Sequence, residues 1–463
     1  MKFVVGARFW GLGVCSANSN KKKAEPWGPT KQFVQDLSAR KNEPGWMTDI
    51  RVQALSFFQK LAMPAWGPDL SQLDAHDIQY YVQPPIAQTR SWEDIPVKIK
   101  STFDYLGLPH AEREFLAGLG VQYESEMLYK SLRQEWASCG VIFVDTDTGL
   151  AEYPELFKKY FGSLVPAHDN KFTALNTALW SGGSFVYVPA GVALDKPLQA
   201  YFRIEAERMG QFERTLILVE DGASIHYVEG CSAPIYRTQS LHCGVVELIA
   251  QKNARVRYTT IQNWSTNVYN LVTKRALAHE NAIVEWIDGN IGSAVTMKYP
   301  SVVLQERGAR ASLLSLSFAS AGQQQDTGGA MIHRAPDTHS FMLSKAISKQ
   351  GGRSTFRGKI MVEKGATGVS ARSQCDALLL DGQSHTAAIP VVRVAEKKCS
   401  VGHEGSVSAL DSAQLFYLMS RGLNKQRAYS MMVNGFVHAC LSQIPSEYAI
   451  ELQLLLEREM EGL

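Results

Sequence analysis

Residues 222–230 read "GASIHYVEG", and residues 253–262 repeat the same arrangement as "NARVRYTTIQ". Each stretch begins with a turn residue followed by alanine, and continues as a run rich in Val, Ile, Thr and Tyr, which is typical of β-strands. Three further turn pairs precede similar runs: Asn281-Ala282, Gly308-Ala309 and Gly365-Ala366.

The spacing of these turn pairs is nearly constant. Successive pairs begin 31, 28, 27 and 57 residues apart, and the last interval is close to two periods. The missing turn is therefore expected near Pro336-Asp337, just before "THSFMLSKAIS". Such a period without a helical spacer predicts stacked coils of a parallel β-helix, because one coil cannot bury its apolar face alone. A β-sandwich is the alternative, but it would show irregular spacing and hairpin turns such as Asn-Gly.

The predicted fold is mainly β, with a right-handed parallel β-helix over residues 166–405 and a helical region on each side. Residues 31–165 carry helical signals, including "YESEMLYKSLRQEWASCG" at 123–140, which we expect to be a helix that stops at Gly140. Residues 406–463 form a C-terminal helical domain, in which Asp411 is expected to cap the first helix. The helical layer also suits the open end of a solenoid.

Composition is that of an ordinary globular protein: 463 residues, 45% hydrophobic, 20% charged and a formal net charge of +2. This charge gives no general attraction to nucleic acid or to an anionic membrane. No apolar run of about 18 residues is present, so no spanning helix is expected. Residues 1–30 form a basic tail, read either as a frayed terminus or as an organellar transit peptide.

The seven cysteines are scattered along the chain, and no C-x-x-C pair occurs. An odd number of cysteines in a large chain indicates a reducing compartment and not a disulfide framework. Any metal ligands must therefore come from distant positions in the sequence.

Several enzyme classes are disfavoured by the motifs. The segment "GGRSTFRGKI" at 351–360 fails as a phosphate-binding loop, because its glycine spacing is too long and Ile360 stands where Ser or Thr would bind magnesium. A hydrolase with Cys231 or Cys375 as nucleophile lacks a nucleophile elbow. A carbohydrate-active β-helix would need clustered acids, and those of this region are dispersed: Asp376, Asp381 and Glu396.

Metal or sulfur chemistry remains open. Thiol, imidazole and carboxylate groups fall within thirty residues: Cys375, His385, Cys399, His403 and Glu404. This mixture suits iron, and an incomplete ligand set suits a labile cluster. The simpler alternative is a buried strand cysteine beside a surface His-Glu pair. Cys231 is expected on a turn, either reachable by a partner or without a role.

The chain resembles the SufB proteins, in the SufB/SufD family of the SUF iron–sulfur cluster assembly system, from about residue 40 to the C-terminus. The motifs that carry the resemblance are long: "LAGLGVQYESE", "YFRIEAERMGQFERTLILVEDGASIHYVEGCSAP", "IQNW", "SQCDALLLDGQSHTAAIP" and "HEGSVSALDSAQLFYLMSRGL". SufD is the close relative within the family, and it generally lacks the "SQCD" and "EGC" thiols that are present here.

The resemblance implies a non-enzymatic assembly scaffold with several partners. The SufC ATPase would bind the C-terminal helices, SufD or a second SufB would pair through the β-helix, and a SufS–SufE type system would deliver persulfide sulfur. The expected location is the cytoplasm, or an organelle if the basic tail is a transit peptide. A nascent iron–sulfur cluster would be held transiently. A flavin is linked to such complexes, but no dinucleotide fingerprint occurs here. The alternative function is a SufD-like adaptor that recruits the ATPase without holding a cluster.

The resemblance also implies roles for single residues. Cys231 would accept sulfur, and Cys375 would bind the cluster with Glu404 and His403. The sulfur-transfer path would be lined by four further residues: Arg203, Gln262, Trp264 and Lys274. A thiolate at Cys231 would be favoured by a nearby cation, with Arg203 and Lys274 as candidates.

Two positions depart from the family pattern. Glu205 replaces the usual Asn after "FRI", which places a charge on the expected path, and Gly402 stands where an acid often precedes His403. The connection after "IQNW" is also shorter than in many relatives.

Overall fold

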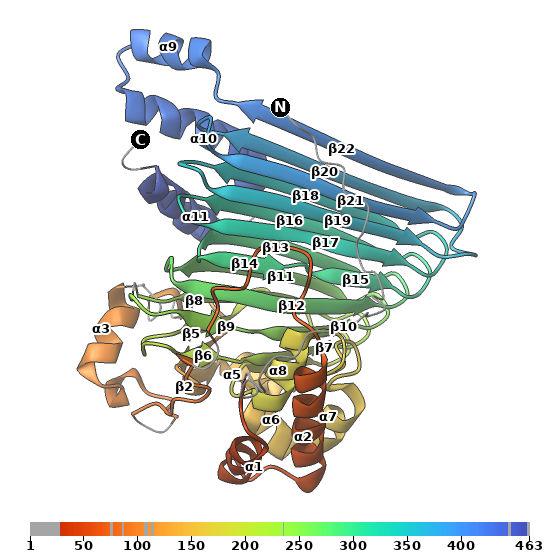
Figure 1. Ribbon diagram of the computed structural model, residues 1–463. Helices are drawn as coiled ribbons and strands as arrows, with labels where there is room; N and C mark the ends of the chain where they lie inside the picture. The colour runs from red at the N-terminus through yellow and green to blue at the C-terminus, as the bar shows by residue number, and fades with distance from the viewer. Residues whose placement is uncertain are drawn as a thin grey trace, which may run out of the picture.

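The structure is a computed structural model that describes residues 28–460 except 75–76, 86–87, 106–109, 113–114, 235 and 443–445. Two large β-sheets face each other and are wound from successive parallel strands, with helices at both ends of the chain (Figure 1). The predicted parallel β-helix with helical flanks is therefore confirmed. The predicted tail lies almost entirely outside the described residues.

The first sheet has ten strands in the order β2-β1-β5-β8-β11-β13-β16-β18-β20-β22. All its pairs are parallel except β1 with β2. Its strands are β1 (Gly118–Tyr123), β2 (Glu126–Leu132), β5 (Leu198–Arg203), β8 (Ser224–Ser232), β11 (Arg255–Trp264), β13 (Ile283–Gly292), β16 (Arg310–Ala319), β18 (His339–Ser348), β20 (Val369–Leu379) and β22 (Cys399–Ala409).

The second sheet has twelve strands, and its main path runs β21-β19-β17-β14-β12-β10-β7-β4-β3. Shorter strands fill breaks beside β12. The members are β3 (Ile142–Asp145), β4 (Ser184–Val188), β6 (Gly210–Gln211), β7 (Arg214–Val219), β9 (Ser240–His242), β10 (Val245–Ala250), β12 (Val268–Ala278), β14 (Val295–Lys298), β15 (Ser301–Leu304), β17 (Gln324–His333), β19 (Arg353–Val362) and β21 (His385–Val394).

A ladder of turn residues sets the period of the solenoid. Each has positive φ, and its N–H donates to a carbonyl one coil further on; for example, Asn281 N–H bonds the Arg307 carbonyl at 3.0 Å. Gly, Asn and Asp occupy these positions because they tolerate left-handed backbone. The ladder comprises Gly191, Gly222, Asn253, Asn281, Gly308, Asp337 and Gly368.

The expected skipped turn is present at Asp337 (φ +56°). The last predicted position is wrong by three residues. Gly368, and not Gly365, stacks on this ladder, because Gly368 N–H bonds the Lys398 carbonyl at 2.7 Å. Both glycines have positive φ, so sequence alone could not decide which one continues the stack.

Alternation along each strand separates two unlike faces of the first sheet. In β16, Leu313 and Ser315 face the solenoid interior, whereas Leu314, Leu316 and Phe318 face outward. The outward leucines are buried because the C-terminal helices cover them. Because the outward apolar side chains are buried under these helices, the inward positions can carry polar side chains without leaving apolar ones exposed.

The N-terminal region contains helices and strands. Its helices are α1 (Lys31–Arg40), α2 (Gly45–Lys60), η2 (Trp92–Asp94), α3 (Val97–Tyr105), α5 (Gln134–Ser138), α6 (Thr146–Glu152), α7 (Pro154–Tyr160) and α8 (Lys171–Leu179). The predicted helix over 123–140 is wrong for residues 123–132, and only the last part, α5, is helical and ends just before Gly140. Residues 118–132 form the β1–β2 hairpin, since β1 pairs with β5 and joins the first sheet.

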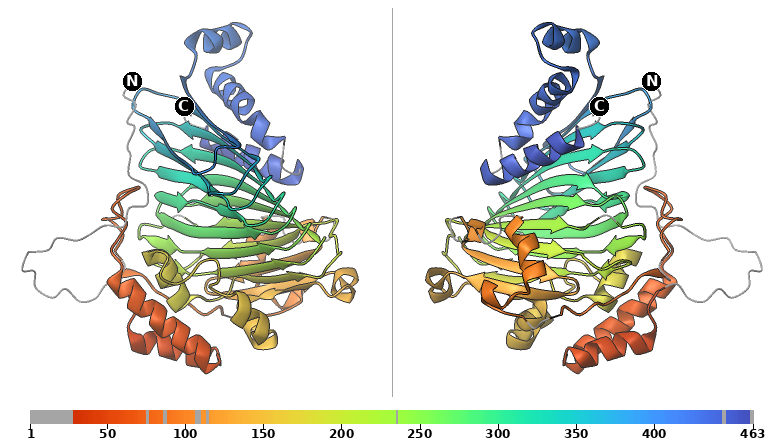
Figure 2. Two further views of the ribbon diagram at one scale, coloured as in Figure 1. Left: turned by 90° about the vertical axis from the view of Figure 1, so that its right-hand side faces the viewer. Right: turned by 90° about the vertical axis from the view of Figure 1, so that its left-hand side faces the viewer.

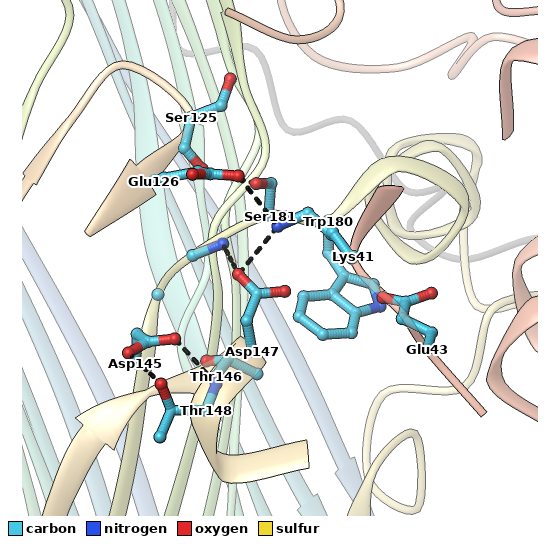
Figure 3. A network of polar contacts seen from close by, with 12 residues as sticks. Lys41, Glu43, Ser125, Glu126, Asp145, Thr146, Asp147, Thr148, Trp180 and Ser181 are labelled. Atoms are coloured by element: carbon cyan, nitrogen blue, oxygen red, sulfur yellow. Dashed lines mark hydrogen bonds and ion pairs between the residues drawn. The ribbon is translucent and has the colours of Figure 1, made fainter. Parts of the chain in front are cut away.

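A buried cation fastens the N-terminal helices to the first coils. Lys41 Nζ lies 2.9 Å from Asp147 Oδ2 and 3.6 Å from Glu126 Oε1 (Figure 3). Asp147 also accepts the Gly182 N–H at 3.0 Å. One ammonium group thus joins the end of α1 to the β1–β2 hairpin and to α6, and Asp147 of α6 extends the contact to the loop before β4.

The C-terminal helices are α9 (Ser412–Ser420), α10 (Lys425–Leu441) and α11 (Ser446–Glu459). Asp411 caps α9 by accepting the Ala413 N–H, as predicted. The helices α10 and α11 pack on the outer face of the first sheet, while α9 projects past the last strand (Figure 1). The N-terminal helices lie at the other end of the solenoid (Figure 2).

Candidate functional site

Cys231 lies near the end of β8 and faces the solenoid interior. Its side chain is 2% exposed and belongs to the interior core. The expectation of a thiol on an accessible turn is therefore wrong for this structure. Its neighbour across the strands is Gln262 in β11, which also faces inward.

A charged pair lies beside this thiol. Cys231 Sγ is 3.8 Å from Glu229 Oε1, because residues two apart on a strand share a face. From the opposite sheet, Lys274 Nζ reaches Glu229 Oε1 at 3.2 Å and Thr260 Oγ1 at 2.7 Å. The Tyr258 hydroxyl donates to the other Glu229 oxygen. The carboxylate is thus neutralised inside the solenoid.

These surroundings favour the thiol form of Cys231. Burial raises its pKa well above the ordinary value, and the Glu229 charge raises it further, against weaker opposite effects of Lys274 and Lys298. For Glu229, burial acts to raise the pKa, but Lys274 and Tyr258 hold it below the ordinary value. Burial and the negative charge of Glu229 therefore oppose the expected cation-favoured thiolate.

A second buried pair continues the network. Lys298 Nζ lies 3.2 Å from Asp288 Oδ1 and 3.2 Å from Gln262 Oε1. Gln262 Oε1 also accepts from Asn270 Nδ2 at 2.7 Å, and Asn270 Oδ1 contacts His242 Nδ1 at 2.8 Å. The interior near Cys231 is therefore a connected polar network.

His242 forms the far end of this network. Its Nε2 faces Glu213 Oε1 at 2.8 Å, and its ring lies 4.7 Å from that of Trp264. Burial acts to lower the pKa of His242, but Glu213, Asn270 and Glu229 together raise it above the ordinary value.

One row of inward-facing residues joins this network to Cys375. The cross-strand partners in successive strands of the first sheet are Glu229, Thr260, Asp288, Ser315, Ser344 and Cys375. Every member of this row, which we call the polar row, is nearly or fully buried. Five strand spacings separate β8 from β20, which corresponds to about 24 Å. The two thiols are thus far apart but face one interior, in which this row of polar side chains runs beside apolar ones.

Cys375 lies one strand from the end of the first sheet. It is 7% exposed, and burial followed by the Asp376 charge raises its pKa to about 11. A Cβ added to Gly405, its partner on β22, would lie 3.2 Å from Cys375 Sγ and 4.0 Å from His403 Nε2. The structure therefore brings Cys375 and His403 together around the space that this glycine leaves.

Glu404 lies on the other face of the sheet. It follows His403 in the strand, and its half-exposed carboxylate pairs with Arg372 on the outer surface. Gly402 is two residues away, so an acid there would face outward as well. Among the described residues, no three His, Cys, Asp or Glu side chains are grouped to hold a metal ion. The predicted set of Cys375, His403 and Glu404 is not assembled in the single chain.

The residues expected to line the sulfur-transfer path likewise lie partly inside and partly outside the solenoid interior. Gln262, Trp264 and Lys274 face the interior. Arg203 faces outward. Its cross-strand partner is Ser232, which adjoins the inward-facing Cys231 and therefore points the other way. Arg203 Nη1 donates to the Ser232 hydroxyl at 3.0 Å. Arg203 also forms an ion pair with Glu205 at 2.8 Å. The unusual charge at Glu205 is thus neutralised outside the solenoid interior.

Glu124, beside this pair, carries an unusual backbone and an unusual pKa. It is buried with φ +58°, and burial raises its pKa to about 7, against the opposite effect of hydrogen bonds from the Glu205 and Ala206 backbone N–H groups. Because the folded pKa exceeds the unfolded one, the folded state loses stability as pH rises from about 4.5 through 7.

We expect Glu124→Gln to remove this pH dependence. The free energy of unfolding of the wild type relative to the variant should fall by about 3 kcal/mol between pH 4.5 and 8. Denaturant unfolding at several pH values measures the difference. Glu207→Gln is the control, because Glu207 is exposed and follows Glu205 by two residues. A difference that stays constant with pH would contradict the assignment.

Sequence reasoning missed Glu229, Asp288, Lys298 and His242. A signal existed for the first, because Glu229 precedes Cys231 by two residues and must share its face. The others required the pairing of strands about 28 residues apart and the contact between the two sheets.

The fold and this network define a class: a parallel β-solenoid protein whose thiols and paired charges are enclosed between its sheets. The chain belongs to the SufBD family. Residues 202–436 match the family model described as SUF system FeS cluster assembly, SufBD core domain, and residues 35–200 match that of the SufBD protein N-terminal region.

Known relatives agree with this assignment. The chain is 54% identical over 435 residues to an iron-sulfur cluster assembly SufBD family protein of Staphylococcus aureus strain USA300, and equally to one of Staphylococcus epidermidis. Each alignment covers 94% of both chains. Within the described residues, no helix has the length and apolar character needed to cross a membrane.

Proposed function

We propose that this chain is a SufB-type scaffold on which iron–sulfur clusters are assembled. The observation that carries the proposal is the polar row, which links the Cys231 network to Cys375 through a buried interior. Burying a polar group costs free energy unless the group is hydrogen-bonded. A solenoid with a purely structural role could have apolar side chains at these positions.

Sulfur enters at Cys231. A donor persulfide R–S–SH reacts at its outer sulfur: a bond forms to Cys231 Sγ, the donor S–S bond breaks, and R–S⁻ leaves. The Cys231 proton moves to Glu229, 3.8 Å away, and finally to the leaving thiolate. The products are Cys231–S–SH and R–SH, so no external oxidant or reductant is needed. Because Cys231 is buried, transfer from a SufS–SufE type donor requires a conformational change that exposes its thiol.

The cluster is built as cargo at Cys375 and His403, and Glu404 joins when β22 is displaced. This strand is the edge of its sheet, and most of its residues are exposed or half-exposed. In the second sheet the edge strand β21 likewise exposes Val392 and Val394, each 45% exposed. Unpaired edges next to apolar side chains suit a pairing surface, and we assign them to SufD or to a second copy.

The C-terminal helices supply the docking surface for a SufC ATPase. Three side chains of α9 are exposed although large and apolar: Phe416 at 74%, Tyr417 at 55% and Met419 at 42%. Exposed apolar groups on a projecting helix are typical of an interaction site. We place the assembled complex in the cytoplasm.

A SufD-like adaptor without a cluster is the second candidate. It is favoured by the burial of Cys231, which together with the Glu229 charge raises the pKa of the thiol. The two are separated by anaerobic purification with the ATPase, followed by visible absorbance and counting of iron and sulfide. A scaffold will show charge-transfer bands that depend on this chain, and an adaptor will show none.

Sulfur loading tests Cys231 directly. After incubation with a desulfurase and cysteine, mass spectrometry of the alkylated chain should find persulfide on Cys231 and none at that position in Cys231→Ser. Cys243→Ser is a matched control, because Cys243 is also buried and its thiol pKa is also raised by burial. Equal loading of the wild type and Cys231→Ser would reject the acceptor role.

A further inference from the structure

Two hydrogen-bond donors in the interior near Cys231 have no acceptor. Gln262 Nε2 and Trp264 Nε1 are buried and have no acceptor among the described residues. The orientation of Gln262 is fixed, since its Oε1 accepts from both Asn270 and Lys298. Gln262 is the cross-strand neighbour of Cys231, and Trp264 lies two residues further along β11.

Lys298 adds a cation to these donors. Its side chain is fully buried on β14 and approaches from the sheet opposite Cys231. Asp288 holds it at one side and Gln262 at the other. Its charge acts on both Cys231 and Glu229, as does that of Lys274. Burial lowers the pKa of Lys298, partly offset by Asp288.

A cluster of two ammonium groups and two unpaired N–H donors is suited to an anion. Most of the cluster is neutralised at rest, because Glu229 pairs with Lys274 and Asp288 with Lys298. A small additional anion bound here would accept hydrogen bonds from the two buried donors. No protein side chain would need to gain or lose a charge.

We propose that Lys298, held in place by Asp288, binds the anionic outer sulfur of a persulfide on Cys231. This inference rests on the proposed sulfur-accepting function and names a residue that neither the sequence nor the resemblance singled out. Lys274, Gln262 and Trp264 complete the site. The ligand is thus a soft monoanion attached to Cys231, and the site lies at the beginning of the polar row.

Ionisation of the persulfide releases one proton to solvent. Cys231–S–SH loses its outer proton and becomes Cys231–S–S⁻, while Glu229 stays ionised because Lys274 and Tyr258 hold its pKa below the ordinary value. The new sulfur anion pairs with the ammonium of Lys298. No electron is gained or lost.

The test follows the ionisation of the loaded persulfide. The full-length chain is loaded anaerobically with cysteine persulfide, and the near-ultraviolet band of the persulfide anion is titrated with pH, with Cys231→Ser as the blank. Lys298→Met should raise the apparent pKa of the outer sulfur by about one unit, which is about tenfold in its ionisation equilibrium. Lys298→Arg keeps the charge and should titrate near the wild type.

Lys345→Met is the matched control. Lys345 pairs with Asp376 at 2.7 Å in the same solenoid, but on the outer face under α10, so its loss should leave the titration unchanged. If Lys298→Met fails to fold, the double variant Asp288→Asn/Lys298→Met removes both charges and should show the same raised pKa.

Two failures can be told apart. A wild-type chain that folds but takes up no persulfide at Cys231 overturns the proposed function itself. A wild-type chain that loads, with Lys298→Met or the double variant titrating at the same pH, overturns only the role of Lys298.

Discussion

Cys375→Ser will abolish cluster formation on the complex while leaving the solenoid intact. The substitution keeps the size of the side chain, and Ser344, its neighbour in the polar row, shows that a hydroxyl is accepted at this level. A serine oxygen is a much poorer ligand for iron and sulfide than a thiolate. After anaerobic reconstitution with the ATPase and a sulfur donor, the visible absorbance and the bound iron should fall to background.

The matched control is Cys399→Ser. Cys399 lies on the neighbouring strand β22 and packs against the interior core near the open end. Its position in the strand register is several residues away from that of Cys375 on β20. It should retain the wild-type yield of cluster. Cys375→Ser with undiminished iron and absorbance would remove Cys375 from the ligand set.

Lys274→Met will lower stability strongly. Lys274 and Glu229 are both essentially unexposed, so removing the ammonium leaves a buried carboxylate without its cation. Such a loss typically costs about 3–5 kcal/mol. The midpoint of denaturant unfolding, monitored by circular dichroism, should fall accordingly at neutral pH. The deficit should shrink at pH 5, because a buried Glu229 without Lys274 takes up a proton.

Two controls define this result. Lys252→Met breaks an exposed ion pair with Glu280 between coils, and should leave stability nearly unchanged, because solvent screens such pairs. The double variant Glu229→Gln/Lys274→Met should recover much of the loss, because no buried charge remains. A single variant Lys274→Met as stable as the wild type would show that Glu229 is neutralised in another way.

The fold was predictable because its signal is repeated. A coil must place a left-handed turn residue at the same level as the coil before it, so Gly, Asn or Asp returns at each period. Asn253, Asn281 and Gly308 follow this rule. The failure at Gly365 has a local cause, since two glycines three residues apart both adopt positive φ, and only stacking on the neighbouring coil selects Gly368.

The error at residues 123–140 has a different origin. The segment contains good helix formers, but Glu124 adopts positive φ in a tight turn and β1 pairs with β5, which is distant in sequence. Pairing with an existing sheet edge outweighed local propensity, as tertiary context often does.

Within the candidate site, the sequence and its resemblance to the family led to Cys231, Cys375 and the inward-facing residues Gln262, Trp264 and Lys274. They could not determine the face on which a residue at a strand end lies. Arg203 and Glu404 each adjoin an inward-facing position, and one step along a strand reverses the direction of a side chain.

Period, turn chemistry and strand propensity are local properties, and they were enough to predict stacked β coils that carry two thiols in an otherwise ordinary chain. The contacts of Lys274 and Lys298 with Glu229 and Asp288 across the interior became visible only in the folded chain. Those contacts join opposite sheets, and their distances depend on how the coils stack and how the two sheets face each other, which no local pattern encodes.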